Sequence, residues 1–233
     1  MYKARHCRVD KLASFVAEQL FGYSEWHSKE HMLERVAVAG FRRGLRYVAV
    51  AGSPKYLNLY EVDDLATLTS QPYLARLNDP TPWTRRALPD LYHNSRTLCR
   101  VVASRGGGIC GLLLTVQLAP QRATADALLA WLIDEILPQL VGRPGIAGAH
   151  LLQGDQASRA GTEEKRLRGD ADPIADWIVL VGGYDAHALR AVRDDTLADG
   201  QLAAHGAAVA PTVGLYQLLH GITEPDLAIQ ERD

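Results

Sequence analysis

The hydrophobic positions of the first hundred residues change their spacing along the chain. They recur first at helical intervals and then in β-branched and aromatic runs on either side of a Gly-Ser-Pro turn, which is typical of a β-hairpin. An Asn-Asp-Pro-Thr-Pro segment should end the helix that follows the hairpin. We therefore expect a helix over 11–38 interrupted at Gly22, strands over 45–51 and 55–62, a helix over 65–77 and a strand over 96–104.

The second half of the chain predicts strands and helices in the order β-α-β-β-α-β. The expected elements are strands over 111–119, 145–154, 176–184 and 212–222, and helices over 125–140 and 186–205. The first half has the same order if a strand over Tyr2–Val9 opens it. The segment 40–46 then aligns with 145–150, each just before a second strand, which indicates two copies of one supersecondary unit.

This order predicts an α+β fold made of two tandem ferredoxin-like units, each with both helices on one face of a four-stranded sheet. Strands such as 178–181 are apolar throughout, so we expect them to be buried on both sides and the two sheets to pack against each other. The predicted domains are residues 1–106 and 107–233, joined by the glycine-rich segment 105–111. Segment 156–173 is predicted to be a solvated loop over a pocket.

Composition and charge narrow the class of protein. Hydrophobic residues make up 47% and charged residues 22% of the 233 residues, and the net charge is −2, so we expect a soluble folded protein without a nucleic-acid or membrane surface. No secretory signal is recognised at the N-terminus, which predicts a cytoplasmic location. Three cysteines without metal-site spacing predict reduced thiols. Exposed strand edges could pair two copies into a homodimer.

The segments WHSKEHMLERVAVAGFRRGLRYVAVAGSPKYLNLYEV and SQPYLARLNDPTPWTRR resemble the dimeric α/β-barrel superfamily, and within it the EthD-like bacterial members. The resemblance covers residues 23–103 well and the second half by element order. It implies two fused units forming a pseudo-dimeric α/β barrel, with a pocket between sheet and helices in the N-terminal half. Members include cofactor-free monooxygenases, cyclases, isomerases and lyases, together with haem enzymes built from two fused units.

Residues 27–31 spell H-x-x-E-H, the zinc-binding string of inverted metalloproteases. His27 and His31 would share a helix face, but a third ligand is expected from a downstream glutamate, and none occurs between Glu61 and Glu135. The sequence therefore favours no metal at this motif.

The alternative is acid–base chemistry without a cofactor, with His31 as the proton acceptor and His27 as its orienting partner. Alternation along the hairpin places Asn58 and Tyr60 on one face, where they could bind a substrate. Arg46 on the adjacent strand could bind a carboxylate or stabilise an oxyanion, and Trp83 could form a wall of the pocket. Each of these side chains could instead have a purely structural role.

The predicted function is a small-molecule enzyme of the lyase, isomerase, decarboxylase or oxygenase type, acting on an aromatic or carbonyl-bearing metabolite. One alternative is a haem enzyme of the fused-barrel type, with His150 or His205 as the iron ligand. Another is a small-molecule binding protein that catalyses nothing. The reaction class and substrate stay open at the level of sequence.

Overall fold

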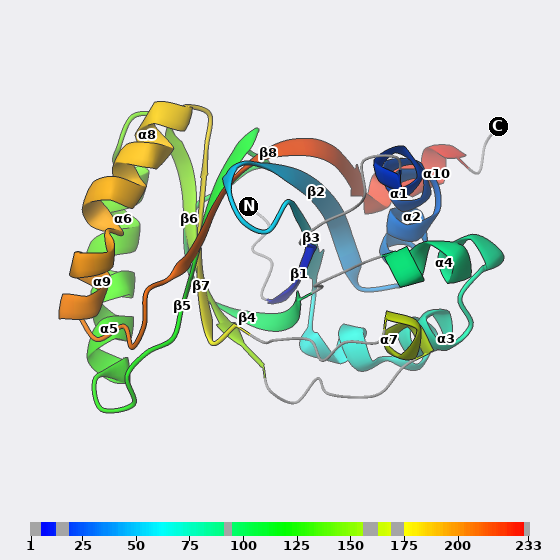
Figure 1. Ribbon diagram of the computed structural model, residues 1–233, viewed down its shortest axis with the longest axis horizontal. Coiled ribbons are helices and arrows are strands. Elements are labelled where there is room, and N and C mark those ends of the chain that lie inside the picture. Colours follow the sequence, from blue (N-terminus) through cyan, green and yellow to red (C-terminus); the bar gives the residue numbers. More distant parts are fainter. Residues whose placement is uncertain (1–5, 13–18, 91–94, 156–162, 169–174, 231–233) are drawn as a thin grey trace.

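The computed structural model describes residues 6–12, 19–90, 95–155, 163–168 and 175–230. Within these residues eight antiparallel strands close into one barrel in the order β1-β3-β2-β8-β5-β7-β6-β4 (Figure 1). The strands are β1 (His6–Leu12), β2 (Phe41–Gly52), β3 (Tyr56–Val62), β4 (Ser95–Gly106), β5 (Leu112–Leu118), β6 (Ile146–Gly154), β7 (Trp177–Gly183) and β8 (Thr212–Thr223).

The strand order repeats once around the barrel. The quartets β4-β1-β3-β2 and β8-β5-β7-β6 both place their strands in the order fourth, first, third, second, which is the ferredoxin-like order. The expectation that two sheets stack face to face needs correction, because the quartets join along their edges through the pairs β2–β8 and β4–β6. Since each strand has two neighbours, none of the eight offers a free edge, and a homodimer stays a prediction without an assigned contact.

Helices cover the barrel on two opposite sides (Figure 1). On one side lie α5 (Ala125–Trp131), α6 (Leu137–Val141), α8 (Ala186–Ala191) and α9 (Asp199–Ala204). On the other lie α1 (Gln19–Trp26), α2 (Met32–Val36), α3 (Gln71–Asn78), α4 (Pro82–Ala87), α7 (Glu163–Arg168) and α10 (Glu224–Gln230). A π-helical turn at 27–31 joins α1 to α2, and another at 132–136 joins α5 to α6. A third, at 192–196, follows α8 and precedes the segment before α9. Two 3₁₀ turns occupy 65–69 and 88–90.

The sequence prediction needs four corrections to its helices. Lys11 and Leu12 belong to strand β1, and Gly22 lies inside α1, so the interruption of the first helix is the π-helical turn at 27–31 instead. The segment 65–77 begins as a 3₁₀ turn before α3 starts. Helices α4, α7 and α10 were not expected, and residues 2–5, 13–18, 156–162 and 169–173 of the predicted segments lie outside the described residues.

Every strand of the barrel has an inner and an outer face. On β3, Leu57 and Leu59 belong to the apolar cluster inside the barrel, whereas Tyr56 and Tyr60 pack in clusters beneath the helices. The predicted alternation of the hairpin is therefore confirmed. A fourth cluster fills the layer between the C-terminal helices and their strands, and its side chains are aliphatic apart from two tryptophans.

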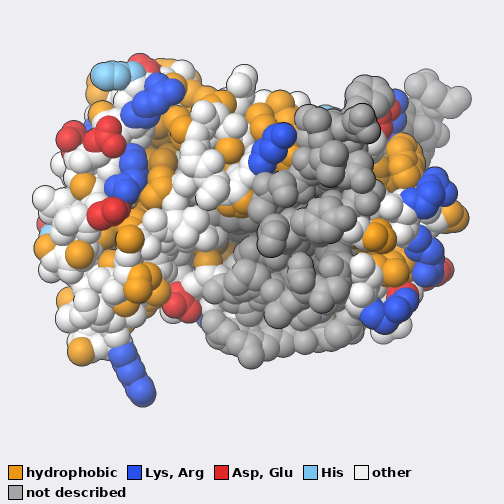
Figure 2. Space-filling view, viewed as in Figure 1, with side chains coloured by type: hydrophobic (Ala, Val, Ile, Leu, Met, Phe, Trp, Pro, Cys, Tyr) orange, Lys and Arg blue, Asp and Glu red, His pale blue; other side chains and the backbone are white. Residues whose placement is uncertain are grey.

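The surface shows no continuous region of one charge on the helices at the left of Figure 2, where Lys and Arg side chains lie between Asp and Glu side chains. Among the helices that the structure describes, none is both long and apolar enough to cross a membrane.

Candidate functional site

One face of the first helical segment carries polar and aromatic side chains where an aliphatic stripe would be expected. Tyr23, His27, His31 and Arg35 follow one another at intervals of four residues and are all buried, with exposed fractions of 0–6%. The π-helical turn spans the middle of this stripe and places the rings of His27 and His31 5.4 Å apart between their centroids. π-helical turns of this kind occur frequently at functional sites.

The corresponding helix of the C-terminal half supplies an internal comparison. Trp131 precedes its π-helical turn as Trp26 precedes the first one, and Gly145 follows Trp131 at the same distance along the chain at which Gly40 follows Trp26. In this register the four positions of the stripe are occupied by buried aliphatic residues, namely Leu128, Leu132, Ile136 and Leu140. The fold at this position therefore does not require polar side chains.

Two strands supply the other wall of the site. Arg46 of β2 and Asn58 of β3 lie directly opposite each other in the sheet, and both are buried. The Asn58 amide donates to the Tyr23 hydroxyl over 3.1 Å, and Arg46 donates to the Ser24 carbonyl over 3.1 Å. The Tyr60 hydroxyl lies 3.4 Å from His27 Nε2. The predicted residues His27, His31, Arg46, Asn58 and Tyr60 thus meet in one helix–sheet layer.

Two of these polar groups keep unused hydrogen-bonding capacity. Within the described residues, the buried Asn58 Oδ1 and Arg46 Nε have no hydrogen-bond partner. Such groups are costly in a protein interior, so each one calls for an explanation. A ligand with a hydroxyl group and a negatively charged oxygen would satisfy both.

The electrostatics of the site are set by burial of a cation. Burial lowers the pKa of the Arg46 guanidinium, while the surrounding hydroxyls of Tyr23, Tyr60 and Tyr56 act in the opposite direction. His220 of β8 lies directly across the sheet from Arg46, and burial together with this cation lowers its pKa. An anion bound at Arg46 would offset the cost of burying the guanidinium.

Glu30 of the H-x-x-E-H string has a structural role. Its Oε1 accepts hydrogen bonds from the hydroxyls of Thr81, over 2.6 Å, and Thr84, over 3.0 Å. The Thr84 hydroxyl also accepts from the Trp26 indole over 3.0 Å, which ties the first helix to α4. Trp83 is partly buried against the cluster of Tyr23, Trp26, Tyr56 and Leu88, and its role as a pocket wall stays a prediction.

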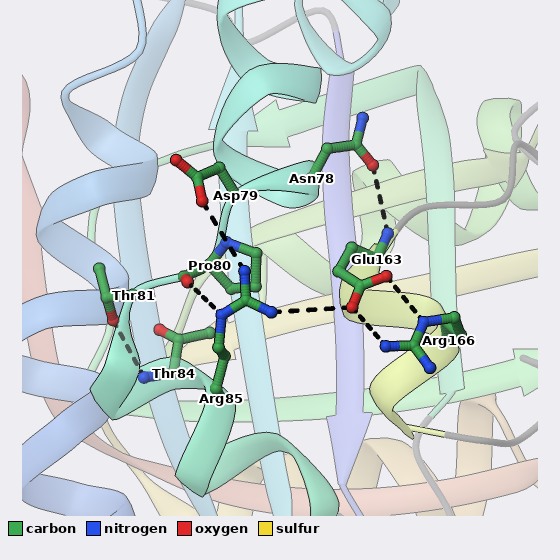
Figure 3. A network of polar contacts seen from close by, with 8 residues as sticks. All are labelled: Asn78, Asp79, Pro80, Thr81, Thr84, Arg85, Glu163 and Arg166. Carbon is green, nitrogen blue, oxygen red and sulfur yellow. Dashed lines mark hydrogen bonds and ion pairs between the residues drawn. The ribbon is translucent and has the colours of Figure 1, made fainter.

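Helix α7 attaches the C-terminal half to this layer. The Glu163 amide donates to Asn78 Oδ1 over 3.2 Å, and its carboxylate pairs with Arg166 on α7 and lies 3.8 Å from Arg85 on α4 (Figure 3). Arg85 in turn donates to the Pro80 carbonyl over 3.0 Å. Leu167 packs against the aromatic cluster, so part of segment 156–173 is a docked helix rather than the expected loop.

The residues considered as metal or haem ligands have other contacts in the structure. Among the described residues, no three His, Cys, Asp or Glu side chains gather as metal ligands, and Glu30 is held by its two threonines. The helix layer of the C-terminal half is filled by aliphatic side chains. His205 stacks on Trp131 at 3.8 Å between ring centroids, and His150 lies in the wall of the barrel cavity.

The sequence prediction missed four residues of the layer: Tyr23, Arg35, Thr84 and His220. The four-residue spacing that links Tyr23, His27, His31 and Arg35 was a visible signal, because an amphipathic helix should place apolar residues at these positions. The contribution of His220 depends on the pairing of β2 with β8, which local sequence patterns do not reveal.

Comparisons with known proteins support the fold. No protein-family model matches the chain, and no curated protein matches it. Among solved structures, an anthrone oxidase-like protein superposes with a TM-score of 0.66 at 16% identity, covering 95% of this chain and 94% of the other.

Two further structures share the architecture. A proposed monooxygenase from Lactobacillus acidophilus gives a TM-score of 0.60 at 8% identity, with 95% and 97% coverage of the two chains. A haem-binding protein from Thermus thermophilus gives 0.52 at 11% identity, with 97% and 94% coverage. The expected resemblance to dimeric α/β-barrel proteins is confirmed at the level of fold, and the EthD-like assignment stays a prediction.

Proposed function

We propose that the chain is a small-molecule enzyme that removes a proton from a carbonyl-activated or phenolic substrate in the helix–sheet layer of the N-terminal half, without a cofactor. The observation that carries this proposal is the replacement of an aliphatic stripe by Tyr23, His27, His31 and Arg35 at positions where the other half uses leucine and isoleucine. Buried polar side chains that the fold does not need are typical of functional sites.

Within this layer we assign His31 as the base. A histidine changes its protonation near neutral pH, so it can accept a proton from an acidified C–H or O–H group. His27, held against the Tyr60 hydroxyl, orients the neighbouring ring of His31. The Arg46 guanidinium stabilises the enolate or phenolate oxygen that forms, and Asn58 Oδ1 accepts a hydrogen bond from a substrate hydroxyl.

Among lyase, isomerase, decarboxylase and oxygenase reactions, we favour the oxygenase type. The structural neighbours include an anthrone oxidase-like protein and a proposed monooxygenase, which agrees with this choice. An electron-rich carbanion can pass its electrons to dioxygen, so that a CH₂ group and O₂ give a C=O group and water. The protein then needs to supply only a base, an oxyanion partner and a site that excludes water.

We also propose that the chain consists of two fused ferredoxin-like units with the boundary near residue 106. The repeated strand order, the matching π-helical turns and a bulge at the same position of β2 and β6 support this division. On this proposal the units share a scaffold, while only the first has acquired the polar layer.

Anthrone is a suitable probe, because its methylene group is acidified by the ring system. Oxygen consumption is measured with the wild type and with His31→Ala, and deuterium exchange at the methylene carbon is measured without oxygen in D₂O. We expect His31→Ala to lower both rates above background by about 10²-fold or more, the usual contribution of a general base. The folded state is verified by circular dichroism.

His187→Ala is the matched control, because His187 is an exposed histidine on α8. It should leave both rates unchanged. Exchange that depends on His31 without oxygen uptake would support proton transfer and remove the oxygenase outcome. Equal rates in wild type and His31→Ala, or the absence of both reactions from the wild type, would contradict the proposal.

A further inference from the structure

The interior of the barrel contains a cavity of about 550 Å³. Cavities that hold small molecules usually measure roughly 300–1,000 Å³, so this one can enclose a ring compound. Much of its wall is apolar and comes from strands of both halves, through the side chains of Leu45, Leu59, Val101, Leu113, Leu152 and Leu180. The cavity is thus a product of barrel closure and belongs to neither half alone.

Two cross-strand pairs place polar groups in the cavity wall. Arg43 of β2 forms an ion pair with Glu61 of β3, and its buried Nε has no hydrogen-bond partner among the described residues. Ser104 of β4 lies opposite His150 of β6, with its hydroxyl 2.5 Å from His150 Nδ1. Pairs of this kind are expensive inside a barrel, since water must be removed from each charged or polar group.

Five glycines shape the cavity wall next to these pairs. Gly106, Gly107 and Gly108 all have positive φ angles and line the cavity. Gly148 and Gly182 face each other on β6 and β7, where a Cβ would approach His150 Nε2 to 3.2 Å and Cys110 Sγ to 2.9 Å, respectively. Glycine at these positions leaves room for the imidazole and the thiol in the wall.

The cavity carries no net charge near neutral pH. The Arg43 and Glu61 charges offset each other. Burial and the nearby Arg43 cation lower the pKa of His150, and burial raises the pKa of the Cys110 thiol, so both of these groups are neutral. A ligand with its own net charge would find no unpaired partner here.

The sheet separates this cavity from the helix–sheet layer. Arg43, Leu45 and Tyr47 of β2 line the cavity, whereas Arg46 of the same strand faces the helices. The two locations therefore lie on opposite faces of one sheet and can be altered independently.

We propose that the barrel cavity is a second binding site, for a neutral aromatic compound that carries a hydroxyl or carbonyl group. The ring lies against the leucine-rich wall. The polar substituent bonds to the His150 imidazole or to the Arg43–Glu61 pair, since both lie in the cavity wall and Arg43 Nε has no hydrogen-bond partner among the described residues. This site does not depend on the chemistry assigned to His31.

The test uses displacement of the neutral fluorescent probe N-phenyl-1-naphthylamine from the full chain by 1-naphthol and by 1-naphthoate. We expect the wild type to bind 1-naphthol in preference to 1-naphthoate. Glu61→Gln leaves the Arg43 charge unpaired, so the preference should shift toward 1-naphthoate by about tenfold or more, the size of a charge-assisted hydrogen bond. An unchanged preference would overturn the assignment of the polar groups.

A second variant tests the location. Leu180→Trp fills the cavity and should weaken binding of 1-naphthol by at least about tenfold. Leu219→Trp is the matched control, because Leu219 is 49% exposed on β8, and it should bind as the wild type does. His31→Ala should also bind normally, which separates this proposal from the first one. Failure of 1-naphthol to displace the probe from the wild type, or equal binding by Leu180→Trp, would refute the cavity as a binding site.

Discussion

Replacing the two buried histidines by the residues that the other half uses should make the protein more stable and less active. The double variant His27→Leu, His31→Ile copies Leu132 and Ile136 of the C-terminal helix. Each new side chain gains about 2 kcal/mol from apolar burial, and each lost imidazole forfeits about 1 kcal/mol of hydrogen bonding. The free energy of unfolding should therefore rise by about 2 kcal/mol, which raises Tm by about 4–8 °C for a chain of this length.

Urea unfolding followed by circular dichroism measures this change, in parallel with the oxygen and exchange assays. Two matched variants control for the chemistry of the substitution. His187→Leu, on the surface, should leave stability unchanged within about 0.5 kcal/mol. The reverse change, Leu132→His with Ile136→His, should destabilise the C-terminal half strongly, since polar groups enter an aliphatic layer. If the His27→Leu, His31→Ile variant is less stable than the wild type, the polar stripe holds the fold together. That result would remove the argument for function.

Four further substitutions test single elements of the structure. Thr84→Val leaves the Trp26 indole donor unsatisfied and should cost about 2 kcal/mol in urea unfolding, but less in a Trp26→Phe background; an equal cost in both backgrounds would contradict the bond. Gly40 has a φ of +94°, and an added Cβ would lie 2.6 Å from Thr67 Oγ1, so Gly40→Ala should destabilise the protein by about 1–2 kcal/mol. Gly22→Ala in α1 should instead stabilise it by about 0.5–1 kcal/mol, because nothing lies within 4 Å of the added Cβ. Burial lowers the pKa of His150 in the folded state, so the unfolded chain binds the proton first as pH falls below about 6.5. The free energy of unfolding should therefore decline in that range, and it should decline less steeply in His150→Gln. Identical pH profiles of the two proteins would refute the assignment.

The strands of the barrel could be predicted because their signals are local. The bounds of β3, β5 and β7 lie within one residue of the predicted ranges, whereas β2 begins four residues before its predicted start. Closure of the strands into one barrel was harder to predict from the sequence, because the strand pairs β2–β8 and β4–β6 connect residues far apart in the chain. Helix α7 also escaped detection, since it is short and is held by contacts with Asn78 and Arg85 rather than by its own pattern.

The candidate site, like the fold, could be predicted only in part from the sequence. His27 and His31 stood out as a motif, and the alternation of the hairpin correctly placed Asn58 and Tyr60 on the helix side. Glu30 is the glutamate of the motif, yet its carboxylate accepts hydrogen bonds from two threonine hydroxyls at the start of α4. A spacing of residues cannot show which partner a side chain will find, since that depends on the packing of distant segments.

The two halves of the chain contribute differently to the barrel and to the candidate site. Closure of the barrel involves all eight strands, so the C-terminal half is part of the scaffold even though its helix layer is almost entirely aliphatic. Burial of apolar side chains in that layer stabilises the fold, whereas the N-terminal half buries imidazole and guanidinium groups. His220 of β8, opposite Arg46 across the β2–β8 pairing, is one of the residues through which the C-terminal half contacts this layer. An isolated N-terminal unit would therefore lack His220 and the β2–β8 pairing that supports Arg46.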